Sequence, residues 1–238
     1  MGKMVQSESG TTRTRTTDIL LGLGFIYGVE IMQLTEKYRP KSWPEVKGQD
    51  KAVKVLSKLE KAGNLSGQAY FITGKTGVGK TTLARIIAGK VSDNLHTMEF
   101  NASRITVNNV REWHENAMYG TLTGAGRVYI LNEAHGLRRD VVRELLVFLE
   151  DLKHDTTVIF TTTLEGQLHF EDSQIDATPL QTRCIQIRLT NQGLLKPFTA
   201  LCLDIASREG LEVKPAAIER IIKESGNSCR AGINALIG

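Results

Sequence analysis

The sequence predicts an α/β protein, in which a doubly wound domain with a parallel five-stranded sheet precedes a small domain of three helices. Three observations lead to this prediction. Short apolar runs alternate with helical patterns from Ala69 onward, as in a parallel sheet that helices cover on both faces. A glycine-rich loop joins the first of these runs to a helix. After about Leu189 the strand patterns stop and only helical patterns follow, so the helical domain is expected at the C-terminal end.

Residues 1–31 are expected to form a poorly ordered extension. They begin with a polar stretch rich in Ser and Thr, and an apolar run from Ile19 to Val29 follows. This run is too short for a helix that crosses a bilayer, which needs about 20 residues. It has the length of a signal-peptide core, which stays an alternative, but no cleavage site of small residues follows it. The fold is therefore expected to begin near Met32.

The α/β domain is expected over residues 32–190, with near-continuous apolar runs as its strands. Such runs are typical of strands that are buried on both faces of a sheet. The expected strands are Ala69–Thr73, Thr97–Asn101, Val128–Asn132, Val158–Thr162 and Ile185–Leu189. A helix is expected over Arg139–Leu152, because its apolar residues recur along one stripe.

The helical domain is expected over residues 191–238. Pro197 and Pro215 suit the first turns of two of its helices, where a missing N–H costs nothing. The expected helices are Leu194–Glu209, Pro215–Ser225 and Cys229–Ile237. Because this group is small and follows the sheet directly, it is expected to form a lid on the α/β domain.

The composition is that of an ordinary globular protein. Of the 238 residues, 41% are hydrophobic and 24% are charged. The formal net charge of +4 is compatible with nucleic acid without requiring it. Cys184, Cys202 and Cys229 lie far apart and form no C-x-x-C pair, so neither a zinc ribbon nor a disulfide framework is expected. The expected location is therefore a reducing, intracellular compartment.

The strongest motif is GKTGVGKT, from Gly74 to Thr81, which fits the pattern G-x-x-x-x-G-K-[ST]. Between a strand and a helix, its backbone N–H groups and the positive end of the helix would face a phosphate. Lys80 would bridge the β- and γ-phosphates of ATP, and the Thr81 hydroxyl would hold Mg²⁺. A chance glycine-rich turn is the alternative, and the order of strand, loop and helix argues against it. The residues expected to bind the nucleotide here are Gly74, Thr76, Gly77, Val78, Gly79, Lys80, Thr81 and Thr82.

The stretch YILNEAHG ends a strand where such proteins usually carry two carboxylates. Here Asn132 occupies the metal side, and only Glu133, which would orient the attacking water, is an acid. An amide keeps the acceptor oxygen but loses the charge, which costs about 1–2 kcal/mol. This corresponds to roughly tenfold in rate or metal affinity. Impaired hydrolysis is therefore expected, and complete loss of hydrolysis is the alternative.

From about Leu34 onward the chain resembles the clamp-loader ATPases of the AAA+ superfamily, in particular replication factor C small subunits and the gamma/tau subunit of bacterial DNA polymerase III. Four segments carry the resemblance: LTEKYRPKSWPEVKGQDKAV, the glycine loop, FNASRITVNNVRE and RVYILNEAHGL. The resemblance implies a P-loop AAA+ fold with a helical lid. It also implies that the adenine base would lie against Tyr38, Arg39, Pro40 and Val46.

Three further residues receive roles from this resemblance. PLQTRC resembles the family's Ser-Arg-Cys box, with Thr182 in place of the serine, and its Arg183 would act in trans on the γ-phosphate of a neighbouring subunit. Thr163 matches the sensor position at a strand end, and Arg230 in GNSCRAGINAL matches a second contact to the γ-phosphate. Without the resemblance, each would be read as a surface or capping residue.

The resemblance also implies partners. The chain would assemble into a ring with other clamp-loader subunits, bind a sliding clamp and contact primed DNA, without a membrane, in the cytoplasm and nucleoid or in the nucleus. Arg104, Arg138 and Arg139 would contact the DNA backbone, and a solvated charged face is the alternative for each.

The sequence therefore predicts an ATP-dependent clamp-loader subunit that opens a sliding clamp at primed DNA. One alternative is a subunit that binds ATP and donates Arg183 without hydrolysing ATP itself, which Asn132 favours. The other is a branch-migration or remodelling motor of the same superfamily. The helical collar that joins clamp-loader subunits is expected to be absent from residues 1–238.

Overall fold

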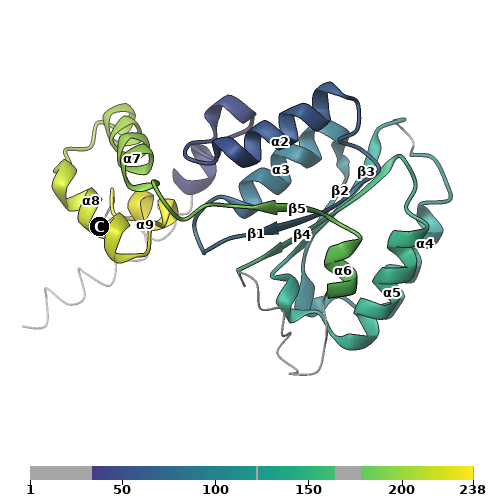
Figure 1. Cartoon of the computed structure of the whole chain (residues 1–238). Coiled ribbons are helices and arrows are strands. Elements are labelled where there is room, and N and C mark those ends of the chain that lie inside the picture. The colour runs from purple at the N-terminus through teal and green to yellow at the C-terminus, as the bar shows by residue number, and fades with distance from the viewer. Residues whose placement is uncertain (1–33, 122, 164–177, 238) are drawn as a thin grey trace, which may run out of the picture.

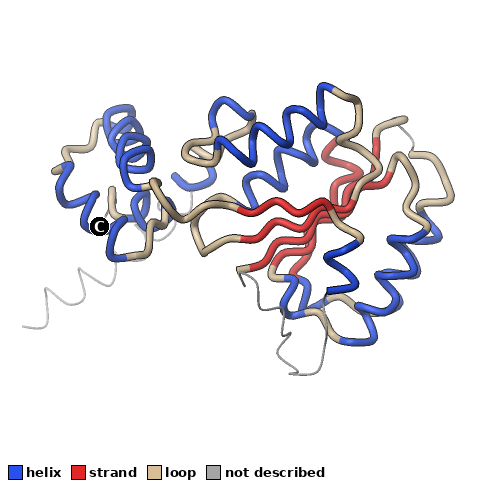
Figure 2. Tube along the Cα trace, in the orientation of Figure 1, coloured by secondary structure: helices blue, strands red, loops and turns tan. Residues whose placement is uncertain are grey.

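The structure is a computed structural model, and it describes residues 34–121, 123–163 and 178–237. The extension predicted over residues 1–31 lies outside these ranges. Figure 1 shows a sheet with helices on both faces and, beyond one end of it, a separate group of helices, α7 to α9. Figure 2 shows the strands as one compact layer between the helices. The predicted α/β fold with a parallel sheet is confirmed.

The sheet has five parallel strands in the order β2-β3-β4-β1-β5. The strands are β1 (Ala69–Thr73), β2 (Ser92–Asn101), β3 (Gly126–Asn132), β4 (Thr156–Thr162) and β5 (Ile185–Arg188). β2 begins at Ser92 and not at Thr97 as predicted, because its polar first half pairs with the start of β3 across a register shift. The first half of β2 carries no apolar pattern that the sequence could reveal.

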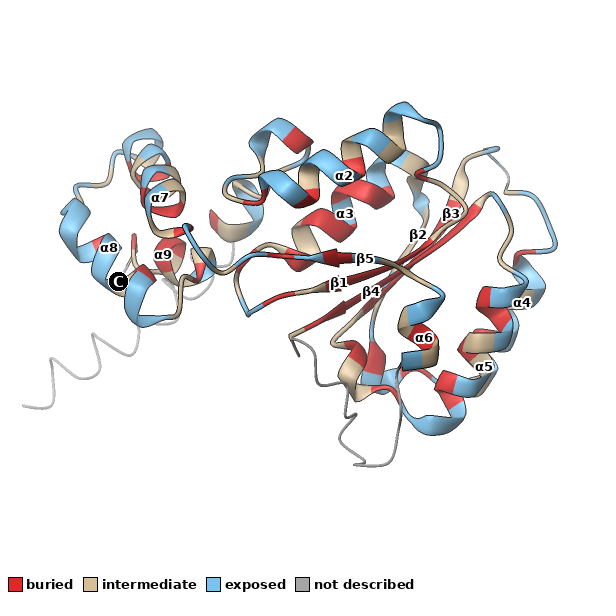
Figure 3. Cartoon of the chain, in the orientation of Figure 1, coloured by how far each residue is buried: buried red, intermediate tan, exposed pale blue. Residues whose placement is uncertain are grey.

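Two layers of helices bury the two faces of this sheet. Along β1, Tyr70 and Ile72 face α2 (Asp50–Lys61) and α3 (Lys80–Val91), whereas Phe71 faces the opposite layer. The opposite layer consists of α4 (Val107–Asn116), α5 (Arg139–Glu150) and α6 (Thr178–Thr182). Figure 3 shows buried residues along β1 and β4 and on the inner sides of α3 and α5. Burial on both faces explains why the three central strands, β1, β3 and β4, are nearly continuous in apolar residues.

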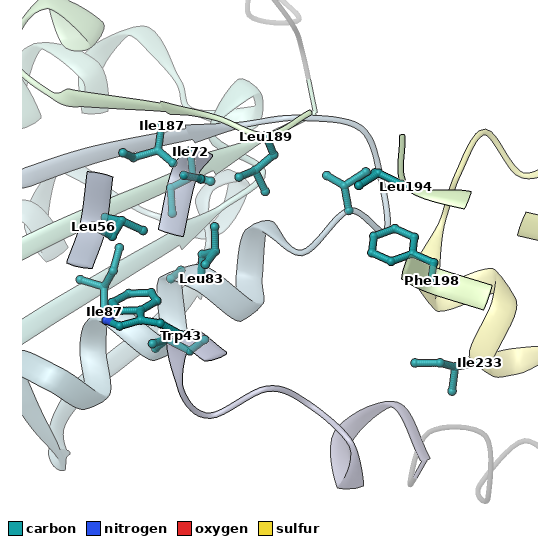
Figure 4. Packing of buried hydrophobic residues seen from close by; sticks show 14 of the residues in the cluster. Trp43, Leu56, Ile72, Leu83, Ile87, Ile187, Leu189, Leu194, Phe198 and Ile233 are labelled. Carbon is teal, nitrogen blue, oxygen red and sulfur yellow. The ribbon is translucent and has the colours of Figure 1, made fainter. Parts of the chain in front are cut away.

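The C-terminal helices are α7 (Leu195–Glu209), α8 (Pro215–Glu224) and α9 (Cys229–Asn234). The first of them, α7, ends at Gly210, whose φ of +66° is the left-handed conformation that glycine adopts without strain. Pro215 opens α8, as the sequence predicts. Phe198 and Leu194 belong to the same buried cluster as the residues that hold α3 on the sheet. Figure 4 shows both side chains beside the loops that connect the sheet with the C-terminal helices.

Within the described ranges, no helix is long and apolar enough to span a membrane.

The packing of α3 against the sheet should dominate the stability of the α/β part. Leu83 on α3 is fully buried, whereas Leu95 on β2 is 80% exposed. We predict that Leu83→Ala lowers the free energy of unfolding by about 2–5 kcal/mol, because it leaves a cavity beneath the helix. Leu95→Ala, the matched control, should change it by less than about 0.5 kcal/mol. Urea unfolding of both variants tests this, and equal losses would contradict it.

Candidate nucleotide-binding site

The glycine loop leaves the carboxyl end of β1 and enters α3. Gly77 and Gly79 have φ values of +80° and +108°, a region that residues with a side chain rarely adopt. Gly79 is also the N-cap of α3, so the first free N–H groups of this helix open toward the loop. The loop therefore has the backbone form that lets successive N–H groups converge on an anion.

Lys80 lies over this loop and is 7% exposed. Its Nζ donates to the carbonyl oxygens of Gly74 at 2.8 Å and Lys75 at 2.9 Å. A buried ammonium needs such acceptors, because burying a charge without them is costly. Its charge is thus concentrated within the loop, where a phosphate oxygen could bind it.

Gln49 fixes the loop to the end of the sheet. Its side chain is 2% exposed and donates from Nε2 to the carbonyl oxygens of Val78 at 3.3 Å and Thr190 at 3.0 Å. Its Oε1 accepts from the Thr190 N–H at 3.0 Å. Because all these groups are buried or partly buried, the amide holds the loop in one position relative to β5.

A pocket lies between the loop, the segment before α2 and the C-terminal helices. Most of the residues predicted to bind the nucleotide line it. They are Tyr38, Arg39, Pro40, Val46, Thr76, Gly77, Val78, Gly79, Lys80, Thr81, Thr82 and Arg230. Gly74 contributes through the carbonyl that accepts from Lys80. Glu133 also lines this pocket, so the loop and the end of β3 face the same space.

The predicted base side of the pocket is tied to both parts of the chain. The Tyr38 hydroxyl and the Lys37 ammonium share the Glu209 carboxylate at the end of α7, and the Tyr38 hydrogen bond to Glu209 raises the pKa of Tyr38. Arg39 donates to Thr82 Oγ1 at 3.2 Å. The segment thus bridges the start of α3 and the end of α7.

The start of α9 lies directly against the glycine loop. The Cys229 N–H donates to the Gly77 carbonyl at 3.1 Å, and Ser228 caps α9 by accepting from Ala231 N at 3.3 Å. A Cβ on Gly77 would collide with the Ser228 side chain. Arg230 is exposed and reaches the pocket from this helix start.

Asn132, at the end of β3, is connected to the glycine loop and to β4 by hydrogen bonds from two hydroxyl groups. Asn132 Oδ1 accepts from Thr161 Oγ1 at 2.8 Å and from Thr81 Oγ1 at 3.4 Å. Glu133 follows in the left-handed conformation, with a φ of +56° that is uncommon for a residue with a side chain. His135 Nδ1 lies 3.4 Å from Glu133 Oε2. The unusual backbone turns the Glu133 carboxylate into the pocket while Asn132 stays at the sheet.

Asn132 and three further predicted groups do not line this pocket, among the residues that the structure describes. Thr163 follows β4 by one residue. Arg183 follows α6, where its guanidinium pairs with Glu150 and donates to the Pro179 carbonyl at 3.0 Å. Arg104 lies in the segment after β2, and Arg138 and Arg139 lie at the start of α5, and all three are exposed. Each role stays a prediction.

Several residues of the site could not be predicted from the sequence. The pocket is also lined by Thr35, Lys47, Phe198, Leu201, Cys229 and Ile233. Phe198 and Leu201 belong to the apolar stripe of α7, which indicates burial but not a ligand. Burial raises the pKa of Cys229 to about 11, so its thiol stays protonated at neutral pH. Gln49 and Thr161 carried no signal, because single polar residues near strand or helix ends are usually caps.

The fold is similar to that of known proteins. Residues 70–176 match the family model described as ATPase family associated with various cellular activities (AAA). The structure is similar to that of the RuvB Holliday junction branch migration motor of Thermotoga maritima, with a TM-score of 0.66 and 26% sequence identity. The alignment covers 84% of this chain and 64% of that one. The fold is that of a P-loop AAA ATPase.

Comparison with individual proteins gives a more specific resemblance than the family model does. The chain is 31% identical over 214 residues to the replication factor C small subunit of Methanoregula boonei, covering 85% of this chain and 62% of the relative. It is 29% identical over 227 residues to the DNA polymerase III gamma/tau subunit of Mycoplasma genitalium, covering 84% of this chain and 36% of that one. The chain thus spans only part of the length of these relatives. The predicted resemblance to clamp-loader AAA+ ATPases is confirmed.

The contact between the loop and α9 generates a prediction. Gly77→Ala forces a side chain into the left-handed region and brings Cβ to 2.9 Å from Ser228 Cβ, so α9 must move. We predict that it weakens ATP binding at least about tenfold. Gly63→Ala is the control, because its φ of +71° imposes the same strain with nothing within 4 Å. Calorimetric titration with ATP tests this, and equal affinity in both variants would contradict it.

Proposed function

We propose that this chain is an ATP-hydrolysing subunit of a clamp loader, which works in a ring to open a sliding clamp at primed DNA. The observation that carries the proposal is the pocket that the glycine loop, the end of β3 and the start of α9 share. Similarity to replication factor C and DNA polymerase III subunits supports the substrate class and the partners. In this proposal, residues 191–238 are the lid on an α/β domain of residues 32–190.

The residues of the pocket fit ATP with Mg²⁺. A triphosphate carries several negative charges, and the buried Lys80 ammonium with the N–H groups of the loop offers the complementary charge. Magnesium prefers a few protein oxygens together with phosphates. The Thr81 and Asn132 oxygens match this, and within the described ranges no cluster of three His, Cys, Asp or Glu residues offers another metal site. Bound Mg²⁺ would neutralise charge on the phosphates.

Each group of the chain then has a role. Lys80 exchanges its contacts with the loop carbonyls for phosphate oxygens, which would stabilise charge that develops during phosphoryl transfer. Glu133 would orient the attacking water and polarise it. Thr163 would contact the γ-phosphate from the end of β4, and Arg230 from the start of α9. Tyr38, Arg39, Pro40 and Val46 would hold the base.

Arg183 suits a role in a neighbouring subunit. Its guanidinium is at the surface, bound to Glu150, and both partners are exposed side chains. Such a pair contributes little to stability, so the arginine can leave it at low cost. Arg104, Arg138 and Arg139 would follow the DNA backbone on the inside of the ring, in an intracellular setting.

A second function has support from the structural neighbours. Similarity to the branch migration motor extends over 84% of this chain, so a motor that acts on DNA junctions is the alternative. A subunit that binds ATP without hydrolysing it is a further alternative, for which Asn132 is the reason. The experiments below distinguish all three.

The loop generates the first functional prediction. We predict that the chain binds Mg–ATP with micromolar affinity, about 8 kcal/mol, and that Lys80→Ala weakens this at least about a hundredfold. Lys90→Ala, at the other end of α3, removes an exposed lysine that pairs with Glu60 and should leave the affinity unchanged. Calorimetry of all three proteins tests this. Unchanged binding in Lys80→Ala would show that the loop does not hold the phosphates.

The second functional prediction concerns Arg183. Arg183→Ala should leave ATP binding by the isolated chain unchanged and should lower ATP turnover in the assembled ring by about 10³-fold or more.

Turnover is measured with primed DNA and clamp, and separately with a four-way DNA junction. Stimulation by primed DNA and clamp supports the clamp loader, stimulation by the junction alone supports the motor, and no turnover with either supports the subunit that only binds ATP. Weaker ATP binding by the isolated Arg183→Ala chain would overturn the role in trans.

A further inference from the structure

The Asn132 amide is held by three partners on two sides. Its oxygen accepts from the Thr81 and Thr161 hydroxyls, and its Nδ2 donates to Glu99 Oε1 at 2.6 Å. Glu99 lies on β2, beside the strand that ends at Asn132. The neutral amide at the end of β3 therefore touches a carboxylate that the neighbouring strand supplies.

This contact decides which way the amide faces. Hydroxyls both donate and accept, so Thr81 and Thr161 could bind either end of an amide. A carboxylate can only accept, so it can bind only the Nδ2 end. If the amide were turned around, its oxygen would face Glu99 Oε1, two acceptors would meet, and the hydrogen bond at 2.6 Å would be lost. Glu99 Oε1 would then keep only the Arg85 Nη2 donor, at 3.4 Å. Glu99 is thus the partner that directs Oδ1 toward Thr81.

The direction of Oδ1 matters for the metal side of the site. When Thr81 donates its proton to Oδ1, the lone pairs of its own oxygen stay available to a cation. A reversed amide would donate to Thr81 and occupy one of those lone pairs. Donation from Nδ2 to a carboxylate also polarises the amide and makes Oδ1 a stronger acceptor.

Glu99 is itself held in place. Arg85 on α3 donates from Nε to Glu99 Oε2 at 2.8 Å, and its Nη1 donates to Glu36 Oε2 at 3.0 Å. The Glu99 hydrogen bond is the main reason that the pKa of Arg85 is raised. Glu36 in turn pairs with Arg39, which lines the pocket. A polar chain thus runs from the base side of the pocket to Asn132.

We propose that Glu99 is a positioning residue for the metal side of this site, where it orients and polarises the Asn132 amide so that Thr81 can bind Mg²⁺. The inference rests on the proposed nucleotide function. An aspartate at position 132 would have two acceptor oxygens and would need no such direction. The dependence on Glu99 is therefore a property of the asparagine in this chain.

The isosteric change Glu99→Gln should have opposite effects in the native chain and in the Asn132→Asp variant. In Glu99→Gln, the single side-chain oxygen at position 99 pairs with the Arg85 guanidinium, and its NH₂ group then faces the Asn132 NH₂ group. Two donors repel, so the Asn132 amide turns around. With Asn132→Asp present, the same NH₂ group donates to the new carboxylate, and the arrangement is satisfied.

The experiment is a magnesium titration of ATP binding by calorimetry. It compares the native chain, Glu99→Gln, Asn132→Asp and the double variant. We expect Glu99→Gln to raise the half-saturating Mg²⁺ concentration about tenfold in the native background and to leave it unchanged or lower with Asn132→Asp. The matched control is Glu144→Gln, because Glu144 pairs with Arg111 in the same way at 3.1 Å and is 26% exposed, against 29% for Glu99. Glu144→Gln should change nothing, and thermal unfolding verifies the fold of every variant.

Two results would overturn the inference. If Glu99→Gln has no effect in the native background, the orientation of the Asn132 amide does not depend on Glu99. If the half-saturating Mg²⁺ concentration rises equally in both backgrounds, Glu99 only supports the fold. Both outcomes leave the proposed function intact, provided that the native chain binds ATP in a magnesium-dependent way. Lack of such binding by the native chain would overturn the proposed function together with the inference.

Discussion

Parallel pairing of all five strands brings their carboxyl ends to one edge of the sheet, where the glycine loop, Asn132 and Glu133 follow their strands. Since β4 lies between β1 and β3, Thr161 and Thr81 both reach the Asn132 oxygen and hydrogen-bond to it. On the other side of β3 lies β2, which supplies Glu99. Antiparallel pairing of any of these strands would move its end away from the others.

The C-terminal helices depend on the same edge. The last of them, α9, begins where the Gly77 carbonyl accepts from the Cys229 N–H, and Gln49 fixes the loop against the end of β5. Glu209 at the end of α7 binds the segment that leads to the base side. These contacts explain how one pocket comes to be lined by parts of the chain that lie far apart in sequence. A nucleotide in this pocket would touch the loop and the helices together.

The sheet and the glycine loop could be predicted well from the sequence, because both have local signals. Apolar runs mark strands that are buried on both faces, and the loop needs glycine where φ is positive. The polar start of β2 could not be predicted, because pairing with β3 and not local composition makes that segment a strand. The amide at position 132 is visible in the sequence but its partner is not, since Glu99 reaches Asn132 only through the pairing of neighbouring strands. Contacts of this kind are properties of the register and leave no trace in spacing along the chain.

The central claim is that one ATP binds the glycine loop and the start of α9 at the same time. Hydrogen exchange of backbone amides with and without Mg–ATP tests this directly. The account predicts slower exchange at residues 77–82 and at residues 229–231, with no change at residues 139–150 on the far side of the sheet. Protection of the loop without protection of α9 would contradict the shared pocket, and protection of neither would contradict nucleotide binding at this edge.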